Sequence, residues 1–291
     1  MMKYVIGGDC GGTKSVYSAY DIEGSFLSEI TLGAANLLVN TKNSLKTMRS
    51  GVEQLIQSMD GQCQGIVLGI AGLDTSEMHG ELQELFSDLD IPLFLINDAK
   101  LSLYAKLQGE DGILLVAGTG SIALAKYKGD FYRAGGWGHL LGDEGSGYWL
   151  GKKAYQQVSY ELDHEKEFSP FVKEFIEWTG QETPMATIRS FYQLDKSEAA
   201  KAARFVAERE DEIFINILNQ AGLSLAELVK TLIQKAEITE VLPVAFSGSV
   251  LENNQRIAEQ VEKTLGSSFK QVNTKNNKIT QGAWYYWRER Q

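Results

Sequence analysis

The sequence predicts an α/β protein made of two related halves. Short apolar runs typical of buried strands alternate along the chain with longer segments whose apolar residues recur at helical spacing. One pattern also occurs twice, at residues 4–32 and again at 113–135: a strand, a glycine turn, a second strand, a tight turn and a third strand. The repetition lies in the architecture and not in alignable sequence. Since no low-complexity linker separates the halves, we expect two domains that meet through a hinge.

The first half is expected to begin with a three-stranded meander and to continue with alternating helices and strands. Buried strands read as apolar runs that end in turn residues, and they fall at 4–9, 14–21, 25–32, 65–73 and 92–98. Helices read as apolar residues three and four positions apart, and they fall at 44–59, 76–88 and 99–107.

The second half is expected to repeat the meander and then to become mainly helical. The repeated strands fall at 113–118, 121–127 and 131–135. Helical spacing follows at 147–161, 168–178, 195–220 and 222–236. A strand at 242–248, a helix at 250–265, a short strand at 268–272 and a helix in the tail TQGAWYYWRER complete the chain. Trp284 and Trp287 in this tail are interpreted as packing residues.

The composition excludes several classes of protein. Of the 291 residues, 43% are hydrophobic, which supports a full core. The 38 acidic and 28 basic residues give a net charge of −10 without a basic run, which argues against nucleic-acid binding. Cys10 and Cys63 match neither a disulfide nor a zinc spacing. Because we find no signal-peptide pattern and no apolar run of the roughly 20 residues that a membrane span needs, we expect a cytoplasmic protein without a membrane partner.

The first glycine turn has the chemistry of a phosphate site. It follows the first strand and reads Asp9-Cys10-Gly11-Gly12-Thr13-Lys14, which is neither a Walker A motif nor a G-x-G-x-x-G motif. Backbone N–H groups of the two glycines, a hydroxyl and an amine all suit phosphate. Asp9 at the strand end could hold a hydrated Mg²⁺, which favours one or two carboxylates. The alternative is a plain β-hairpin with two glycines at its tip.

Two further turns occupy comparable places in the second half. Gly118-Thr119-Gly120-Ser121 follows the strand that corresponds to the first one, and the two glycine turns together could hold one polyphosphate from both sides. Ser247-Gly248-Ser249 follows the late strand, where small residues could let an adenine or a ribose approach the backbone. Each could instead be only a tight connection between elements.

Several side chains are candidates for contact with a hydroxyl compound, such as a sugar, that receives the phosphate. Asp98 follows a strand and could take a proton from a hydroxyl, or it could cap the next helix. Asp143 and Glu144, in a glycine-flanked loop, could bind sugar hydroxyls or cap the helix after them. Trp137 could form an apolar wall for a sugar or be a core residue. His139 is expected to be structural, because no second ligand lies at metal spacing.

Six segments, in this order, resemble the N-acetylglucosamine kinase family of the BadF/BadG/BcrA/BcrD group, within the actin-like, sugar kinase and heat-shock ATPase superfamily. They are DCGGTKS, GIAGL, INDA, AGTGSIA, GGWGHLLGDEGSGYWLG and FSGSV. The resemblance spans nearly the whole chain. GGWGH followed by GDEGS is specific to the family, whereas DxGGT and GTGS are shared across the superfamily.

The resemblance implies two ribonuclease-H-like domains with mixed sheets, and ATP and sugar in the cleft between them. The N-terminal domain would be 1–110, to which a C-terminal helix of about 277–291 returns. The C-terminal domain would be 111–276, with a helical insertion. Family members are commonly homodimers and close their domains around the sugar, which excludes water from the reaction.

The resemblance also implies the reaction and the residues that perform it. It implies Mg²⁺-dependent transfer of the γ-phosphate of ATP to an amino sugar, with N-acetylglucosamine and its 6-phosphate as first choice. Asp98 matches the catalytic base, which also contacts the sugar, and Asn36, Trp137, Gly138 and Asp143 match the sugar pocket. The nucleotide residues would be Asp9, which also holds Mg²⁺ through water, and Gly11, Gly12, Thr13, Lys14, Gly118, Thr119, Gly120, Ser121, Gly248 and Ser249.

Other activities stay open at the level of sequence. Glucosamine and N-acetylmuramic acid compete as substrates, and the second needs room for a lactyl group and a cation near its carboxylate. The family group also contains ATPases that activate 2-hydroxyacyl-CoA dehydratases through an iron–sulfur cluster held by cysteines, but neither Cys10 nor Cys63 resembles that cluster context. A sugar-binding regulator without catalysis is disfavoured, because Asp98 and both phosphate turns are retained.

Overall fold

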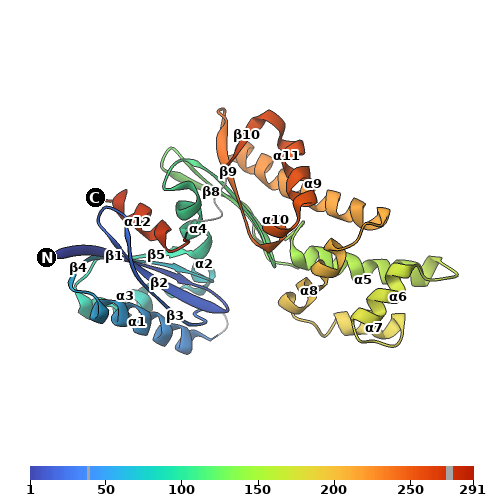
Figure 1. Ribbon diagram of the computed structural model, residues 1–291, viewed down its shortest axis with the longest axis horizontal. Helices are drawn as coiled ribbons and strands as arrows, with labels where there is room; N and C mark the ends of the chain where they lie inside the picture. The colour runs from blue at the N-terminus through green and yellow to red at the C-terminus, as the bar shows by residue number, and fades with distance from the viewer. Residues whose placement is uncertain (38–39, 273–277) are drawn as a thin grey trace. The chain divides into compact units, whose positions relative to one another are not determined.

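The computed structural model describes residues 1–37, 40–272 and 278–291. The chain divides into two compact units, Met1–Gly112 with Asn273–Gln291 and Ile113–Val272. Each unit has its own five-stranded sheet with helices packed on it (Figure 1). The predicted α/β class, with mixed sheets, is therefore confirmed.

The sheet of the first unit has the strand order β3-β2-β1-β4-β5. The predicted meander is formed by β1 (Met2–Cys10), β2 (Lys14–Asp21) and β3 (Phe26–Gly33), which pair antiparallel. The strands β4 (Gly61–Ile70) and β5 (Leu93–Asn97) continue the sheet parallel to β1. The carboxyl ends of β1, β4 and β5 therefore lie at one edge of the sheet, which is where α/β proteins gather ligand-binding residues.

Alternate residues of β1 enter two different cores, as the period of a strand requires. Tyr4 and Ile6 pack in a core that includes apolar residues of α1 (Thr41–Ser58). Val5 packs on the opposite face with α4 (Asp98–Leu107) and the C-terminal helix α12 (Gln281–Arg288). Three short helices, α2 (Leu73–Ser76), α3 (His79–Leu85) and η1 (Ser87–Leu89), connect β4 to β5.

The C-terminal helix α12 packs against β1 and α4, which belong to the beginning of the chain (Figure 1). Trp284 and Trp287 are buried in this contact, as predicted. The helices approach closely at Gly282, where a Cβ would lie 2.2 Å from the carbonyl oxygen of Leu101. The first residue of the expected tail helix, 277, lies outside the described residues.

The sheet of the second unit repeats the topology of the first. It contains β6 (Gly112–Ala117), β7 (Ser121–Tyr127), β8 (Asp130–Gly135), β9 (Leu242–Ser247) and β10 (Phe269–Val272). Its order, β8-β7-β6-β9-β10, matches β3-β2-β1-β4-β5 position by position. The carboxyl ends of the parallel strands β6 and β9 again lie side by side.

Helices cover this sheet, and several of them differ from the prediction. The helices are α5 (Gly147–His164), α6 (Pro170–Trp178), α7 (Pro184–Phe191), α8 (Lys196–Ala207), α9 (Glu212–Lys235), α10 (Ser249–Asn253) and α11 (Gln255–Leu265), followed by η2 (Gly266–Ser268). The expected helix 195–220 is wrong, because the chain breaks after Ala207, at a charged run, and α9 continues through Gly222. Among the described residues, no helix combines the length and apolar character that crossing a membrane requires.

Candidate functional site

The first glycine turn is a β-hairpin that leaves its tip open. Cys10 pairs with Ser15, and the N–H of Gly11 donates to the carbonyl of Lys14 at 3.2 Å. Gly11 and Gly12 do not adopt positive φ, so backbone conformation does not require glycine here. A Cβ at Gly12 would meet its nearest neighbour only at 3.6 Å. The glycines therefore keep the backbone accessible, while Thr13 and Lys14 are exposed beside it.

Asn36 lies against this turn. The N–H of Ala35 donates to the carbonyl of Gly11 at 2.9 Å, which ties the loop after β3 to the hairpin. The neighbour at 3.6 Å from the Cβ position of Gly12 is Asn36 Nδ2. Ser44 at the start of α1 donates to the carbonyl of Asn36 at 2.9 Å and fixes the loop from the other side. The structure thus brings a predicted sugar residue next to the predicted phosphate turn.

Asp98 is the first residue of α4, and another residue caps that helix. The cap is Asn97, whose Oδ1 accepts from the N–H of Lys100 at 2.6 Å. Asp98 is half-buried, and its Oδ1 accepts from the N–H of Ala99 at 2.9 Å. Burial raises the pKa of Asp98, and the charge of Asp74 raises it further. The alternative role as a helix cap, left open by the sequence, therefore belongs to Asn97.

Asp9 and Asp98 reach the same sheet edge from β1 and from the end of β5. Asp9 is half-buried. The strand β4 lies between β1 and β5, and in the register of the sheet Asp9 pairs with Gly69, which pairs in turn with Ile96. Burial raises the pKa of Asp9 to about 6, the negative charge of Asp98 adds to this rise, and Lys14 opposes it. Perturbed carboxylates at the end of parallel strands are typical of functional sites.

Asp74 belongs to this edge although the sequence analysis did not single it out. It lies in α2, directly after β4, and its carboxylate accepts from Asn97 Nδ2 at 2.5 Å. The bond links the loop after β4 to the residue that caps α4. The signal available in the sequence was its place directly after the apolar run 65–73.

The second glycine turn is backed by a helix and adjoins the Gly248 turn. The N–H groups of Gly147 and Tyr148, at the start of α5, donate to the carbonyls of Gly118 and Thr119 at 2.7 and 3.3 Å. Gly248 has a φ of 94°, and a Cβ there would lie 2.5 Å from the carbonyl oxygen of Ala117. Only glycine fits this contact, and the structure thereby joins two of the predicted nucleotide turns.

A cavity of about 560 Å³ opens beside these two turns. Gly118, Thr119 and Ser249, all predicted nucleotide residues, form part of its wall. Most of the remaining lining comes from α5, α8 and α10. The volume lies within the range of small-molecule sites.

Ser121 connects this turn to the glycine-rich loop that follows β8. Its N–H donates to Asp143 Oδ1 at 3.1 Å, its hydroxyl donates to the carbonyl of Glu144 at 2.8 Å, and its carbonyl accepts from Gly136 N–H at 3.1 Å. The predicted phosphate turn and the predicted sugar loop are therefore held together by one residue. The cap of α5 is Ser146, whose Oγ accepts from the N–H of Trp149.

Asp143 is buried, with 3% of its surface exposed, and it takes a positive φ of 64°. In addition to Ser121, it pairs with Lys196 at the start of α8, at 2.7 Å between Nζ and Oδ2. Lys196 was not identified from the sequence. No local motif indicates it, because it lies 53 residues away in a segment that reads only as helix.

Trp137 is 68% exposed, which excludes the alternative of a core tryptophan. The guanidinium of Arg133 lies over its ring, 4.1 Å from the centroid. Gly138 follows with a φ of 86°. His139 packs edge-on against Tyr148 at 4.6 Å between ring centroids.

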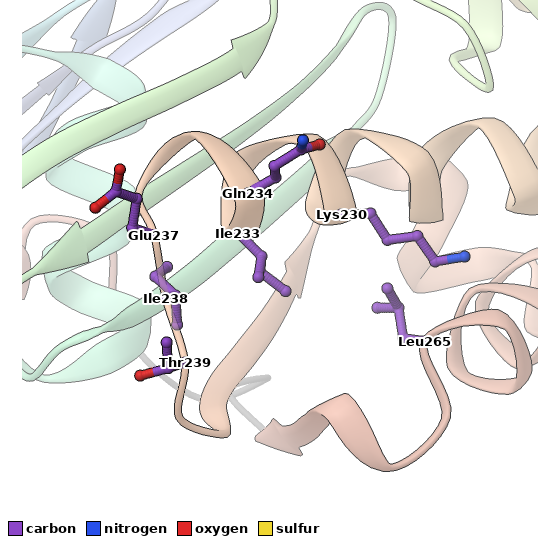
Figure 2. A pocket seen from close by; sticks show the side chains of 7 residues that line it. All are labelled: Lys230, Ile233, Gln234, Glu237, Ile238, Thr239 and Leu265. Atoms are coloured by element: carbon purple, nitrogen blue, oxygen red, sulfur yellow. The ribbon is translucent and has the colours of Figure 1, made fainter.

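A smaller cavity, of about 310 Å³, lies elsewhere in the second unit (Figure 2). It is formed by the end of α9, the segment after it and the end of α11, and it is lined by Lys230, Ile233, Gln234, Glu237, Ile238, Thr239 and Leu265. None of the predicted site residues lines this cavity, so we do not assign the reaction to it.

The residues present fit a magnesium ion that is coordinated mainly by water and by the phosphate oxygens of a bound nucleotide. Within the described ranges, no three His, Cys, Asp or Glu side chains are grouped as a metal site would require. Mg²⁺ needs only one or two carboxylates, since water and phosphate oxygens complete its shell. Asp9 provides such a carboxylate. Cys10 is fully buried and Cys63 half-buried, and both are free thiols.

Comparison with known proteins places the chain in one family. The model of the BadF/BadG/BcrA/BcrD ATPase family matches residues 6–283. An N-acetylmuramic acid/N-acetylglucosamine kinase of Clostridium acetobutylicum is 28% identical over 93% of both chains. An N-acetyl-D-glucosamine kinase of Dictyostelium discoideum is 25% identical over 91% of this chain and 90% of its own. A solved structure from Chromobacterium violaceum, described as a candidate N-acetylglucosamine kinase, superposes with a TM-score of 0.77 at 27% identity, covering 97% of both chains.

Proposed function

We propose that this chain, which belongs to the BadF/BadG/BcrA/BcrD ATPase family, is an ATP-dependent kinase that phosphorylates N-acetylglucosamine on its 6-hydroxyl. The observation that carries the proposal is the placement of Asp98. This carboxylate is half-buried, it does not cap α4 because Asn97 does, and it lies close enough to Asp9 for their charges to interact. Amino-sugar kinases among the relatives that match over nearly the whole chain support the choice of acceptor.

Asp98 acts as the general base of this reaction. As the 6-hydroxyl oxygen attacks the γ-phosphorus, the bond between that phosphorus and the β–γ bridging oxygen breaks, and the hydroxyl proton passes to the Asp98 carboxylate. The products are the sugar 6-phosphate and ADP. A raised pKa makes Asp98 a better proton acceptor than an ordinary carboxylate. The hydrogen bond from the N–H of Ala99 to Asp98 Oδ1 fixes the orientation of the carboxylate.

The glycine turns hold the polyphosphate. The first turn offers its open backbone with Thr13 and Lys14, and the second turn offers residues 118–121 beside the 560 Å³ cavity, which accommodates the adenosine. Asp9 would hold Mg²⁺ through water, and the bound ion would supply positive charge that offsets the charge of the phosphates. Most of the rate enhancement comes from positioning and charge neutralisation, because phosphoryl transfer needs little covalent chemistry from the protein.

Asn36, Trp137 and Gly138 orient the sugar, and Asp143 supports two of them. Asn36 offers its amide beside the first turn, and the exposed ring of Trp137 offers an apolar surface. Since Asp143 is buried and already bonded to Ser121 and Lys196, its contribution is to fix the loop that carries Trp137 and Gly138.

One observation favours N-acetylmuramic acid as a second candidate acceptor. Arg133 lies over Trp137, so a guanidinium stands beside the proposed sugar surface, where the carboxylate of a lactyl group needs a cation. The relative from Clostridium acetobutylicum is named for both sugars.

A coupled ADP-release assay over N-acetylglucosamine, N-acetylmuramic acid, glucosamine and glucose tests the proposal. We expect sugar-dependent ADP release with N-acetylglucosamine, and mass spectrometry should find one added phosphate per sugar. ADP release that is independent of sugar and yields no phosphosugar would overturn the kinase assignment in favour of a partner-activating ATPase. Turnover with N-acetylmuramic acid that falls in Arg133→Ala, while N-acetylglucosamine turnover is kept, would support the second acceptor.

A further inference from the structure

We infer that Lys196 is a phosphate-binding cation of the nucleotide site, held over the second glycine turn by Asp143. The inference rests on the proposed function in taking the nucleotide as the ligand of the 560 Å³ cavity. It adds a charged residue from α8 to a site that the sequence assigned only to glycine turns and their neighbours.

The ammonium of Lys196 lies directly against the turn. A Cβ built on Gly120 would lie 2.8 Å from Lys196 Nζ and 3.0 Å from each oxygen of Asp143. A side chain at position 120 would therefore occupy the place of the ammonium group. Gly120 does not take a positive φ, so the crowding that a side chain would meet here comes from Lys196 and Asp143 and not from the backbone conformation.

The backbone that carries Lys196 is fixed by a capping box. Asp195 caps α8 by accepting from the N–H of Glu198 at 2.8 Å, and the Glu198 side chain accepts from the N–H of Asp195 at 2.9 Å. Lys196 is the next residue, so its side chain starts from a well-defined point. Its ammonium then needs little rearrangement to meet an anion at the turn.

Asp143 anchors the cation from the buried side. The carboxylate is 3% exposed, whereas the Lys196 side chain is 33% exposed. One side of the ammonium therefore faces the anchor while part of the side chain remains open to solvent. A lysine ammonium has three N–H donors, and the ion pair need not use all of them. Such a buried carboxylate holds the cation without covering it.

The cation supplies what the nearby helix end does not. The N–H groups of Gly147 and Tyr148 at the start of α5 already donate to the turn carbonyls. They are therefore not available for a phosphate in the way that a free helix N-terminus is. After Lys196, α8 continues along the cavity wall with Ser197, Ala200, Lys201 and Arg204. The ammonium thus lies where a bound nucleotide passes from its cavity to the turn, and the chemistry that it recognises is a polyphosphate.

Isothermal titration with Mg-ADP and with adenosine separates this role from that of a structural ion pair. For Lys196→Met we expect Mg-ADP to bind about ten- to a hundredfold more weakly, the cost of one lost charge-assisted hydrogen bond, and adenosine to bind as before. Lys196→Arg should recover part of the loss. Lys230→Met, in the same unit but at the other cavity (Figure 2), is the matched control and should bind both as wild type does.

Unchanged Mg-ADP affinity in Lys196→Met would overturn the inference. An equal loss for adenosine and Mg-ADP would overturn it too, because it would indicate general damage to the cavity. These readouts need no sugar. A wild-type protein that phosphorylates none of the tested sugars would refute the kinase proposal and leave the titration result intact, so the two failures are distinguishable.

Discussion

At the scale of single residues, Asp98 makes the sharpest prediction about chemistry. Asp98→Asn keeps the size of the side chain and can still accept a hydrogen bond from Ala99, but an amide cannot take a proton. We expect kcat to fall by about 10²- to 10⁴-fold, the usual contribution of a general base. Sugar affinity, measured by titration, should change little. Near-normal turnover in this variant would contradict the assignment of Asp98 as base.

The neighbouring carboxylate Asp9 predicts a pH-dependent stability of the Mg²⁺-free protein. Its pKa in the folded chain is raised to about 6 from an ordinary value of 3.8, so the folded state holds more protons than the unfolded state between these values. The contribution of Asp9 to stability therefore falls as pH rises from about 4 to about 6. Two units of raised pKa correspond to at most about 3 kcal/mol.

The variant Asp9→Asn tests the direction of this pH dependence. Since the amide carries no charge to bury, we expect the variant to be more stable than the wild type above pH 6.5 and to lose that advantage towards pH 4. Urea unfolding at several pH values, with chelator present, measures the difference. A wild type that is at least as stable as the variant at pH 7 would show that the buried charge of Asp9 does not destabilise the folded protein.

For the first glycine turn we predict a substitution that changes nucleotide binding but not the stability of the fold. Gly12 has no positive φ and has room for a Cβ, so Gly12→Ala should leave the melting temperature nearly unchanged. A methyl group at the open tip should nevertheless keep a phosphate from the backbone, and the KM for ATP should rise. A melting temperature lowered by many degrees would show that Gly12 serves the hairpin instead.

At the scale of elements, the strands and turns of both meanders could be predicted from sequence, because each apolar run ends in a glycine or polar turn. The helical part was harder. We expected separate helices at 195–220 and 222–236, and glycine, which stands at position 222, normally lowers the stability of a helix interior. In the structure α9 runs through Gly222, because α11 packs there so closely that a Cβ would lie 2.6 Å from Gln260 Cβ. Such a contact between distant segments leaves no local trace in the sequence.

The same contact predicts the effect of Gly222→Ala. Alanine favours helix by about 1 kcal/mol over glycine, but overpacking usually costs about 1–3 kcal/mol. We expect a net loss of stability in thermal unfolding. Gly80→Ala in α3 is the matched control, because nothing lies within 4 Å of its Cβ position, and it should be neutral or stabilising. A stabilised Gly222→Ala would show that α11 can shift away.

At the scale of the whole molecule, the two sheets share one topology although their sequences do not align. In both, a glycine turn follows the first strand of the meander, and in both the neighbouring parallel strand ends next to it. Duplicated architecture therefore explains why the turns at 9–14 and 118–121, which are unlike in sequence, could be predicted to occupy corresponding places in the two units. Lys196 and Asp74 could not, since their importance arises only when separate elements fold together.

The returning C-terminus gives the last prediction. Trp284, Tyr286 and Trp287 of α12 are buried in a core that also contains Val5, Val67 and Tyr104. Fully burying a large apolar side chain contributes roughly 1.5–3 kcal/mol, so the three aromatic side chains that are lost with residues 281–291 contribute an amount comparable with the whole stability of an ordinary domain. We expect this deletion to unfold the first unit while the second, which has its own core, still unfolds cooperatively on heating. Hydrogen exchange resolved by peptide measures both units at once. Protection of β1 and α4 that matched the full chain would show that the first unit does not depend on its returning helix.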